Sequence, residues 1–212
     1  MTEFVQQISD DWRAVNWPQV ERTVFRLQQR IYRASQRGDD RTVKSLQRLL
    51  STSWSARMLA VRRVTQENKG KKTAGVDGIA SLKAPERTEL AQNLTLDKRA
   101  APVRRVLIPK PGKSEYRKLG IPTMRDRAKQ ALAKLALEPQ WEALFAPNSY
   151  GFRPGRSPQD ALEQVHRCIC QKPKWVLDAD IAACFDQISH GPLVARLAQS
   201  HPSIARQCKA WL

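Results

Sequence analysis

The sequence lacks the features that mark secreted, membrane-spanning and zinc-binding proteins. No apolar run approaches the roughly 18 residues that a membrane span needs, and the N-terminus, MTEFVQQISDDW, is too polar and acidic for a secretory signal. The few cysteines have neither CxxC spacing nor a nearby histidine pair: they are Cys168, Cys170, Cys184 and Cys208. Reduced thiols are therefore favoured over a disulfide or metal role. These absences predict a cytoplasmic protein with no membrane partner.

Acidic residues are also scarce relative to basic ones. The 212-residue chain carries 37 lysines and arginines against 20 aspartates and glutamates, which gives a formal net charge of +17. Such an excess attracts polyanions, and lysine and arginine bind nucleic acid by releasing counterions from its phosphates. An anionic membrane surface is the weaker alternative, because the sequence shows no lipidation signal and its basic residues are not confined to one amphipathic helix.

Residues from about 12 to 68 are predicted to form helices. Apolar residues recur at helical spacing between Val20 and Ile31, with arginines between them. The sequence Gly-Asp-Asp at 38–40 interrupts this pattern and offers an N-cap for a second helix. The pattern predicts a helical hairpin with a basic outer surface.

A loop rich in glycine and lysine follows at 68–78, NKGKKTAGVDG; we call it the lysine loop. It is open to two interpretations. It is either a flexible connector or a phosphate-contacting loop whose small residues let the backbone approach a nucleic-acid strand. In the second interpretation Lys69, Lys71 and Lys72 contact the nucleic acid.

A β-hairpin is predicted within the strongly basic stretch from 99 to 129. Two short strand patterns, at 103–108 and 116–121, flank the turn sequence Pro-Gly-Lys-Ser at 111–114. Its positive charge favours nucleotide or phosphate binding over the alternative of a merely solvated hairpin. The candidate binding residues are Arg104, Arg105, Lys110 and Arg117.

More helices are predicted beyond the hairpin. Thr123 is an N-cap for a helix that runs to about Phe145, and Ser157 begins another helix with a capping-box-like sequence. Between them lies the segment PNSYGFRPGR at 147–156, which we call the arginine loop. A last helical pattern reaches the end of the chain.

The run from Trp175 to His190, WVLDADIAACFDQISH, places acidic residues in an apolar, strand-like sequence. Alternation along a strand would point Asp178 and Asp180 to the same face. Unpaired carboxylates on a buried strand are costly, so such a strand usually ends at a cation or a solvent-filled cleft. The alternative is a strand that runs out into solvent, with Asp180 capping the turn that follows.

Four sequence patterns occur in order along the chain. They are TAGVDG at 73–78, IPKPGK at 108–113 leading to RKLGIPT at 117–123, SYGFRPGRS at 149–157, and DADIAACFD at 178–186. In this order and spacing they resemble the N-terminal part of bacterial group II intron-encoded reverse transcriptases, or maturases, from about Asp11 onward. Each pattern alone is weak, but the series is highly specific.

The resemblance implies template-directed nucleotidyl transfer with two magnesium ions at the palm. Asp180 matches the family's first palm aspartate, and the backbone carbonyl of Ile181 would be a further ligand. Magnesium prefers such oxygen ligands, and two ions can activate a primer hydroxyl and stabilise the leaving pyrophosphate. Phe185 matches the aromatic residue that lies beneath the incoming sugar, whereas Asp178 is assigned a structural role.

The resemblance also implies roles for the basic residues. Lys110 and Arg117 match residues of the fingers that hold the incoming triphosphate. Arg153 and Arg156 match a block near the template and primer and are predicted to contact phosphates. The N-terminal helices match an extension that binds intron RNA and template. The expected partners are therefore RNA, a DNA primer and dNTP.

The expected fold class is α+β. A helical N-terminal extension is predicted over 1–78, and a partial right-hand polymerase, with fingers and the first palm strand, over 79–212. The chain has RKLG at 117–120 where the family usually has Arg-Pro-Leu-Gly, a change that an edge strand tolerates. The family's Tyr-x-Asp-Asp motif does not occur before Leu212, so the chain is predicted to be truncated ahead of it.

Three alternatives to an active polymerase follow from that prediction. The chain could be an RNA-binding module without catalysis, whose affinity falls steeply with salt. It could be one part of a split enzyme, with the rest of the palm and the thumb on a separate polypeptide. It could also be the remnant of a frameshifted gene.

Overall fold

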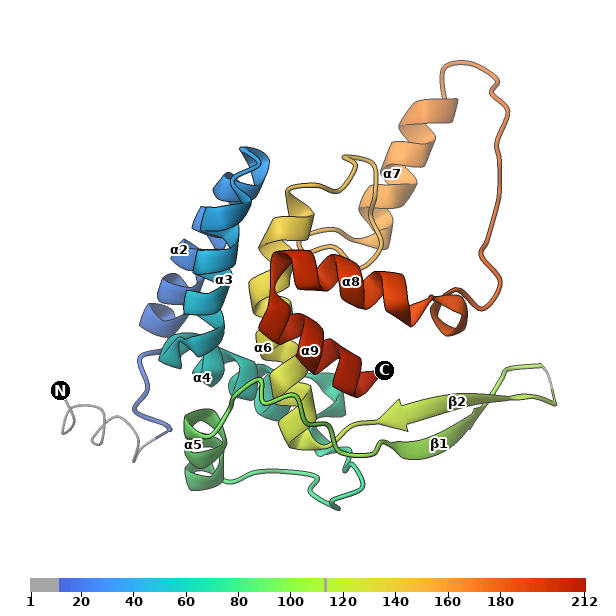
Figure 1. Ribbon diagram of the computed structural model, residues 1–212. Coiled ribbons are helices and arrows are strands. Elements are labelled where there is room, and N and C mark those ends of the chain that lie inside the picture. Colours follow the sequence, from blue (N-terminus) through green and yellow to red (C-terminus); the bar gives the residue numbers. More distant parts are fainter. Residues whose placement is uncertain (1–11, 113) are drawn as a thin grey trace.

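The computed structural model describes residues 12–112 and 114–212. The polar N-terminal segment 1–11 and Lys113 of the predicted turn lie outside the described residues. Figure 1 shows a body of helices from which a β-hairpin and one helix project. No helix in the described ranges is long and apolar enough to cross a membrane. The many helices and the small hairpin confirm the predicted α+β class.

The N-terminal part consists of helices, as predicted: α2 (Trp17–Gln36), α3 (Asp40–Thr52) and α4 (Trp54–Arg62). The Asp39 side chain caps α3 by accepting a hydrogen bond from the backbone N–H of Thr42 at 3.0 Å. Gly38 precedes it with a φ of +68°, a conformation that glycine adopts without strain. The predicted break at 38–40 is therefore confirmed. Two short turns extend α4: η1, a π-turn (Arg63–Glu67), and η2, a 3-10 turn (Lys69–Lys72).

The long helix α6 (Met124–Glu142) lies at the centre of the body, against α2, α3 and α4. Thr123 caps it, as predicted, by accepting the N–H of Asp126 at 3.2 Å. The core residues are almost fully buried, and each such apolar side chain contributes about 1.5–3 kcal/mol of stabilisation. They include Ile31, Leu50, Met58, Leu132 and Leu135. Helices on both sides of the predicted boundary at 78/79 share this core, and the boundary itself stays a prediction.

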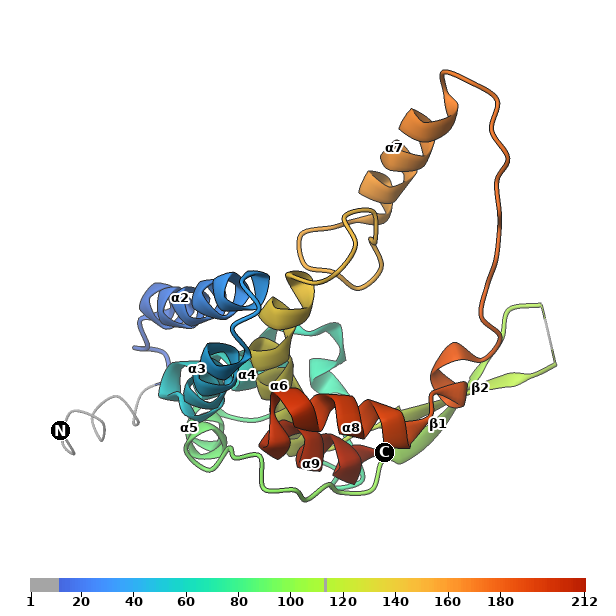
Figure 2. The same cartoon turned by 45° about the horizontal axis from the view of Figure 1, so that its top comes forward.

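The predicted hairpin is confirmed. Its strands, β1 (Arg104–Pro109) and β2 (Tyr116–Ile121), pair antiparallel, with Ile108 opposite Arg117. The backbone N–H of Lys110 donates to the carbonyl of Glu115 at 3.0 Å and closes the turn. Figures 1 and 2 show the hairpin reaching away from the helices, so both of its faces are open to solvent over most of their length.

The remaining helices differ in how far they pack on this body; they are α5 (Ala84–Gln92), α7 (Pro158–Ile169), α8 (His190–Ser200) and α9 (Pro202–Trp211). Helix α7 starts at the predicted Ser157 capping box but buries no residue and points away from the body. Helices α8 and α9 return to it. The side chain of Gln207 donates to the carbonyl of Arg99 at 2.9 Å, and Ile204 joins the core.

The prediction of a strand in the run that begins at Trp175 is wrong. Residues 173–181 have no regular secondary structure, and every residue from 171 to 183 is exposed; Leu177 is 91% exposed. A strand needs a neighbour to satisfy its backbone groups, and β1 and β2 are the only strands in the described ranges, where they pair with each other. We call residues 171–183 the aspartate segment. Figure 1 shows it as a long connection that links α7 to the short turn η3 (Cys184–Gln187).

Candidate nucleic-acid interface

The lysine loop is held in place by Arg127 of α6. Its guanidinium donates to the backbone carbonyls of Gly70 and Pro122, both at 3.0 Å, and also to that of Thr73. One side chain thus joins the lysine loop, the segment that follows β2, and the first turn of α6. Burial lowers the pKa of Arg127; Asp77 opposes this effect and Arg104 adds to it. Arg104 of β1 therefore lies close enough to Arg127 to act on it electrostatically.

Gly75 brings the same loop into direct contact with the backbone before α6. A Cβ atom at this position would lie 2.8 Å from the Cα of Thr123 and 2.9 Å from the carbonyl oxygen of Pro122. Both neighbours are backbone atoms, so a larger residue would force the loop away. Gly75 of the TAGVDG pattern therefore forms a packing contact between the lysine loop and the base of the hairpin. Of the two interpretations, the flexible connector does not fit this anchoring.

The three predicted lysines of the loop lie on the short turn η2. Lys71 donates from Nζ to the backbone carbonyl of Gln66 at 2.6 Å. Lys69 is exposed and makes no ion pair with a described carboxylate. The loop that carries these lysines is fixed to the segment that follows β2, at the base of the hairpin.

The hairpin divides its predicted binding residues between two faces. Side chains directly opposite each other in the register share a face, so Arg104 lies on the face of Ile108 and Arg117. Arg105 lies on the opposite face, with Lys118 of β2.

Lys110 beside the turn already has a partner. Its ammonium lies 2.5 Å from the carboxylate of Glu115 across the hairpin. The hydrogen bond from Lys110, and then its charge, lower the pKa of Glu115, which therefore stays ionised near neutral pH. Exposed pairs of this kind are weak, so an anionic ligand can compete with Glu115 for Lys110.

The two predicted arginines of the arginine loop differ in their surroundings. Arg153 is buried, and its guanidinium donates to both carboxylate oxygens of Glu142, at 2.6 and 3.0 Å. It also donates to the carbonyls of Ala146 and Ser149, at 2.6 and 2.9 Å. Arg153 thus holds the loop onto the end of α6. These bonds occupy most of the donors that a phosphate would need.

Arg156 is only half-buried. It donates to the carbonyls of Pro147 and Ser149 and lies over the ring of Tyr150, 5.1 Å from its centroid. Of the two arginines, Arg156 is the one with a solvent-facing part. From the sequence, phosphate contacts were predicted for both arginines. Their difference in burial could not be predicted, because burial in a loop depends on contacts with a distant helix end.

The predicted metal ligands lie in the aspartate segment. Asp180 is exposed, and its Oδ1 accepts the backbone N–H of Ile181 at 2.9 Å. Within residues 12–112 and 114–212, no group of three or more His, Cys, Asp or Glu residues could hold a metal ion. Two-magnesium sites usually need paired carboxylates, and the described residues gather no such larger ligand group around Asp180.

Phe185 lies next to the arginine loop. Its ring, 76% exposed, meets that of Phe152 edge-on, with centroids 6.4 Å apart. The residue predicted to contact the sugar and the loop predicted to contact template and primer are therefore neighbours. No hydrogen bond or ion pair between described residues links Asp180 to Lys110 or Arg117.

Two basic residues of the stretch from 99 to 129 have structural roles that the sequence did not indicate. Arg127 holds the lysine loop, as described above. Lys129 is 3% exposed and donates to Asp97 at 2.6 Å and to the carbonyl of Arg99 at 2.9 Å. Both lie on the first turns of α6, so a helical-wheel reading against the apolar residues of α6 could have flagged them.

Comparisons with known proteins agree with these features. The family described as N-terminal domain of reverse transcriptase matches residues 12–94. The family described as Reverse transcriptase (RNA-dependent DNA polymerase) matches residues 108–212. The two matches together cover most of the chain, and residues 95–107 lie between them.

Curated proteins are also similar to parts of this chain. Protein YkfC of Escherichia coli (strain K12) is 36% identical over 156 residues, which are 68% of this chain and 41% of that protein. Maturase-like protein 1 of Euglena gracilis is 37% identical over 65% of this chain and 30% of its own length. Group II intron-encoded protein LtrA of Lactococcus lactis subsp. cremoris is 35% identical over 60% of this chain and 22% of its own length. The matched part spans less than half the length of each of these relatives. The chain therefore belongs to the reverse transcriptase family, among the group II intron-encoded maturases.

Proposed function

We propose that the chain binds RNA and grips the incoming nucleotide as part of an RNA-directed DNA polymerase of the group II intron type. Its substrates would be an RNA template, a DNA primer and dNTP, and intron RNA would be a further partner in splicing and mobility. The observation that carries this proposal is the anchoring of the lysine loop to the base of the hairpin by Arg127 and Gly75. It brings two basic elements side by side.

The hairpin residues have distinct roles in this proposal. Lys110 and Arg117 would hold the triphosphate, which their place at one end of the hairpin supports. Arg104, Arg105 and the lysines of the loop would contact backbone phosphates. Cations positioned in this way stabilise charge on transferring phosphoryl groups.

The role of the aspartate segment depends on further carboxylates. Reverse transcriptases generally use magnesium, and Asp180 with the Ile181 carbonyl would contribute ligands to such a site. Because no group of three or more such ligands forms among the described residues, Asp180 would need further carboxylates to complete the site. A separate polypeptide that carries the rest of the palm and the thumb would supply these carboxylates. Phe185 would then lie beneath the sugar of the incoming nucleotide.

We also propose that residues 1–78 act as the RNA-binding extension and residues 79–212 as fingers and early palm. A cytoplasmic location is part of this proposal. The free thiols of all four cysteines support it, since a reducing compartment keeps cysteines in this form.

An RNA-binding module without catalysis is the second candidate. It is favoured by one observation: the segment that carries Asp180 is exposed and unpaired, whereas the basic elements are anchored.

A primer-extension assay with magnesium, an RNA template, a DNA primer and dNTP separates the two candidates. Extension that Asp180→Ala abolishes supports the polymerase. RNA binding without extension supports the module. A chain that neither binds RNA nor extends a primer contradicts both.

A further inference from the structure

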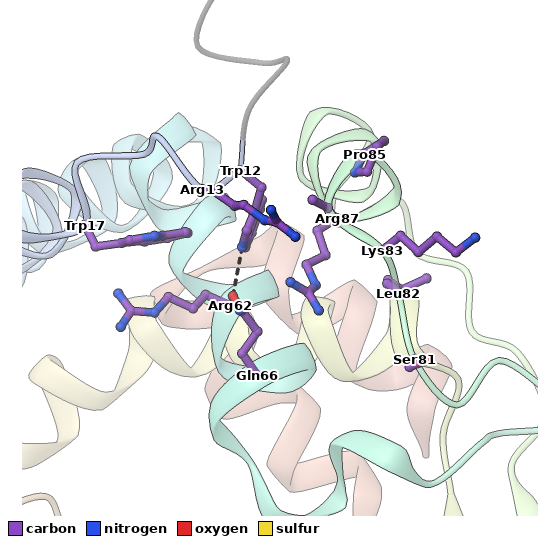
Figure 3. A pocket seen from close by; sticks show the side chains of 11 residues that line it. Trp12, Arg13, Trp17, Arg62, Gln66, Ser81, Leu82, Lys83, Pro85 and Arg87 are labelled. Carbon is purple, nitrogen blue, oxygen red and sulfur yellow. Dashed lines mark hydrogen bonds between the residues drawn. The ribbon is translucent and has the colours of Figure 1, made fainter.

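A cavity of about 850 Å³ opens in the N-terminal part, well away from the aspartate segment. Figure 3 shows it between the segment before α2, the end of α4 with η1, and the segment that enters α5. Trp12 and Trp17 form one wall, with ring centroids 5.0 Å apart. Leu82 and Arg87 face them from the other side. We call this cavity the tryptophan pocket.

The lining of the pocket is strongly basic. Of its 11 lining residues, none is an aspartate or glutamate. The basic ones are Arg13, Arg62, Lys83 and Arg87. Such a concave surface of one charge sign concentrates anions.

The arginines that line it differ in what they already bind. Arg62 donates to Glu21 at 3.0 Å and to Glu67 at 2.8 Å, and lies over Trp17, 4.6 Å from the ring centroid. Its role is to fix the wall. In contrast, neither Arg87 nor Lys83 forms an ion pair with a carboxylate of the described residues.

Arg87 also has an unsatisfied hydrogen-bond donor. Its Nε is buried without a hydrogen-bond partner. A buried donor of this kind costs free energy until a ligand or water accepts from it. A phosphate oxygen is a suitable acceptor, because arginine binds phosphate through strong charge-assisted hydrogen bonds.

Gln66 connects the pocket to the lysine loop. The indole N–H of Trp12 donates to the side-chain oxygen of Gln66 at 2.8 Å, drawn as a dashed line in Figure 3. The backbone carbonyl of the same Gln66 accepts from Lys71 at 2.6 Å. An RNA strand that follows the lysine loop therefore passes beside the pocket.

We propose that the tryptophan pocket binds one unpaired nucleotide of an RNA strand. Arg87 and Lys83 would bind its phosphate, and its base would lie between Leu82 and the partly exposed edge of Trp17. Proteins commonly recognise single-stranded RNA by combining apolar or aromatic contact to a base with cations on the backbone. The inference rests on the proposed RNA binding and adds a subsite to it.

The experiment compares two double variants of the whole chain that each remove two positive charges. Arg87→Gln with Lys83→Gln changes the pocket, and Arg41→Gln with Lys44→Gln changes the exposed surface of α3. The probe is a fluorescein-labelled 15-nucleotide single-stranded RNA, with the same sequence in duplex form as a second probe. Binding is measured by fluorescence anisotropy, and thermal melting checks the fold of each variant.

The pocket variant should lose about tenfold in affinity for the single strand, as expected when a charge-assisted phosphate contact is removed. The α3 variant should lose less than about threefold in affinity for the single strand. The affinities of the two variants for the duplex should be similar. If the pocket variant does not fold, Ser81→Glu tests the same point, because this exposed residue at the rim would place a carboxylate beside the phosphate.

Equal losses for the pocket and α3 variants would overturn the pocket and leave the proposed RNA binding intact. If the pocket variant loses as much affinity for the duplex as for the single strand, relative to the α3 variant, the claim that the nucleotide is unpaired would be overturned. Failure of the unmodified chain to bind either RNA would overturn the pocket together with the proposed function.

Discussion

Two regions of the molecule carry the predicted chemistry, and the fold supports them differently. Phosphate binding is predicted for the lysine loop and the β-hairpin, and metal binding for the aspartate segment. Arg127 and Gly75 bind the loop to the base of the hairpin through backbone contacts. The aspartate segment has no pairing strand and is exposed throughout. The elements proposed to bind phosphate are held in place by contacts within the described residues. The segment proposed to bind metal has no comparable anchoring, and no group of three or more candidate ligands forms among the described residues.

The largest contrast should appear when the same truncation is made in the helical core, on which the lysine loop is anchored, and in the aspartate segment. Leu132→Ala in α6 removes a fully buried side chain and should lower the free energy of unfolding by about 2–5 kcal/mol. Leu177→Ala in the aspartate segment removes a side chain that is 91% exposed and should change it by less than about 0.5 kcal/mol. Urea denaturation measures both. A large loss for Leu177→Ala would mean that the segment packs in solution.

A pair of glycine substitutions sharpens the account of the lysine loop. Gly75→Ala places a Cβ within 3 Å of backbone atoms and should destabilise the fold by about 1–3 kcal/mol. Gly70→Ala, in the same loop, meets nothing within 4 Å and serves as the matched control. Similar denaturation midpoints for the two variants would show that the loop does not depend on the contact with Thr123.

Arg127→Gln should weaken both stability and RNA binding. It removes donors from three backbone carbonyls and should lower the free energy of unfolding by about 1–2 kcal/mol, since each lost hydrogen bond contributes modestly. Arg125→Gln is the control, because Arg125 is exposed and its contact with Asp97 is 3.4 Å long. If the Arg127 variant keeps full RNA affinity at temperatures where it is folded, the anchored lysine loop is not part of the RNA-binding surface.

A smaller effect is expected from acid at the arginine loop. The hydrogen bonds from Arg153, and then its charge, lower the pKa of Glu142 below its ordinary value of 4.5. Because the folded-state pKa is lowered, the pair stabilises the fold fully above pH 4.5, and this stabilisation is lost as the pH falls through the lowered value.

Melting temperatures at pH 7 and pH 3.5 test this dependence. Glu142→Gln should lose less between the two values than the unmodified chain. Glu163→Gln on α7, whose ion pair with Arg167 is exposed, should behave like the unmodified chain. An unchanged acid response in Glu142→Gln would show that the pair contributes little.

What could be predicted from the sequence was mainly local. The caps at Asp39, Thr123 and Ser157 and both hairpin strands follow from short patterns, because a cap or a tight turn is decided within a few residues. The strand from Trp175 was mispredicted because strand formation depends on a partner elsewhere. The sequence also did not distinguish Arg153 from Arg156, or reveal that Lys129 is buried, since distant contacts decide burial.

The claim that the lysine loop and hairpin form one RNA-binding surface can be tested most directly by salt titration of RNA affinity. The measurement compares the unmodified chain with two triple variants to glutamine, one at Lys69, Lys71 and Lys72 and one at Arg104, Arg105 and Arg117. Affinity of the unmodified chain should fall steeply with salt, and each variant should reduce the slope of log K against log salt by about 2. A salt-insensitive affinity, or unchanged slopes in both variants, would contradict the account.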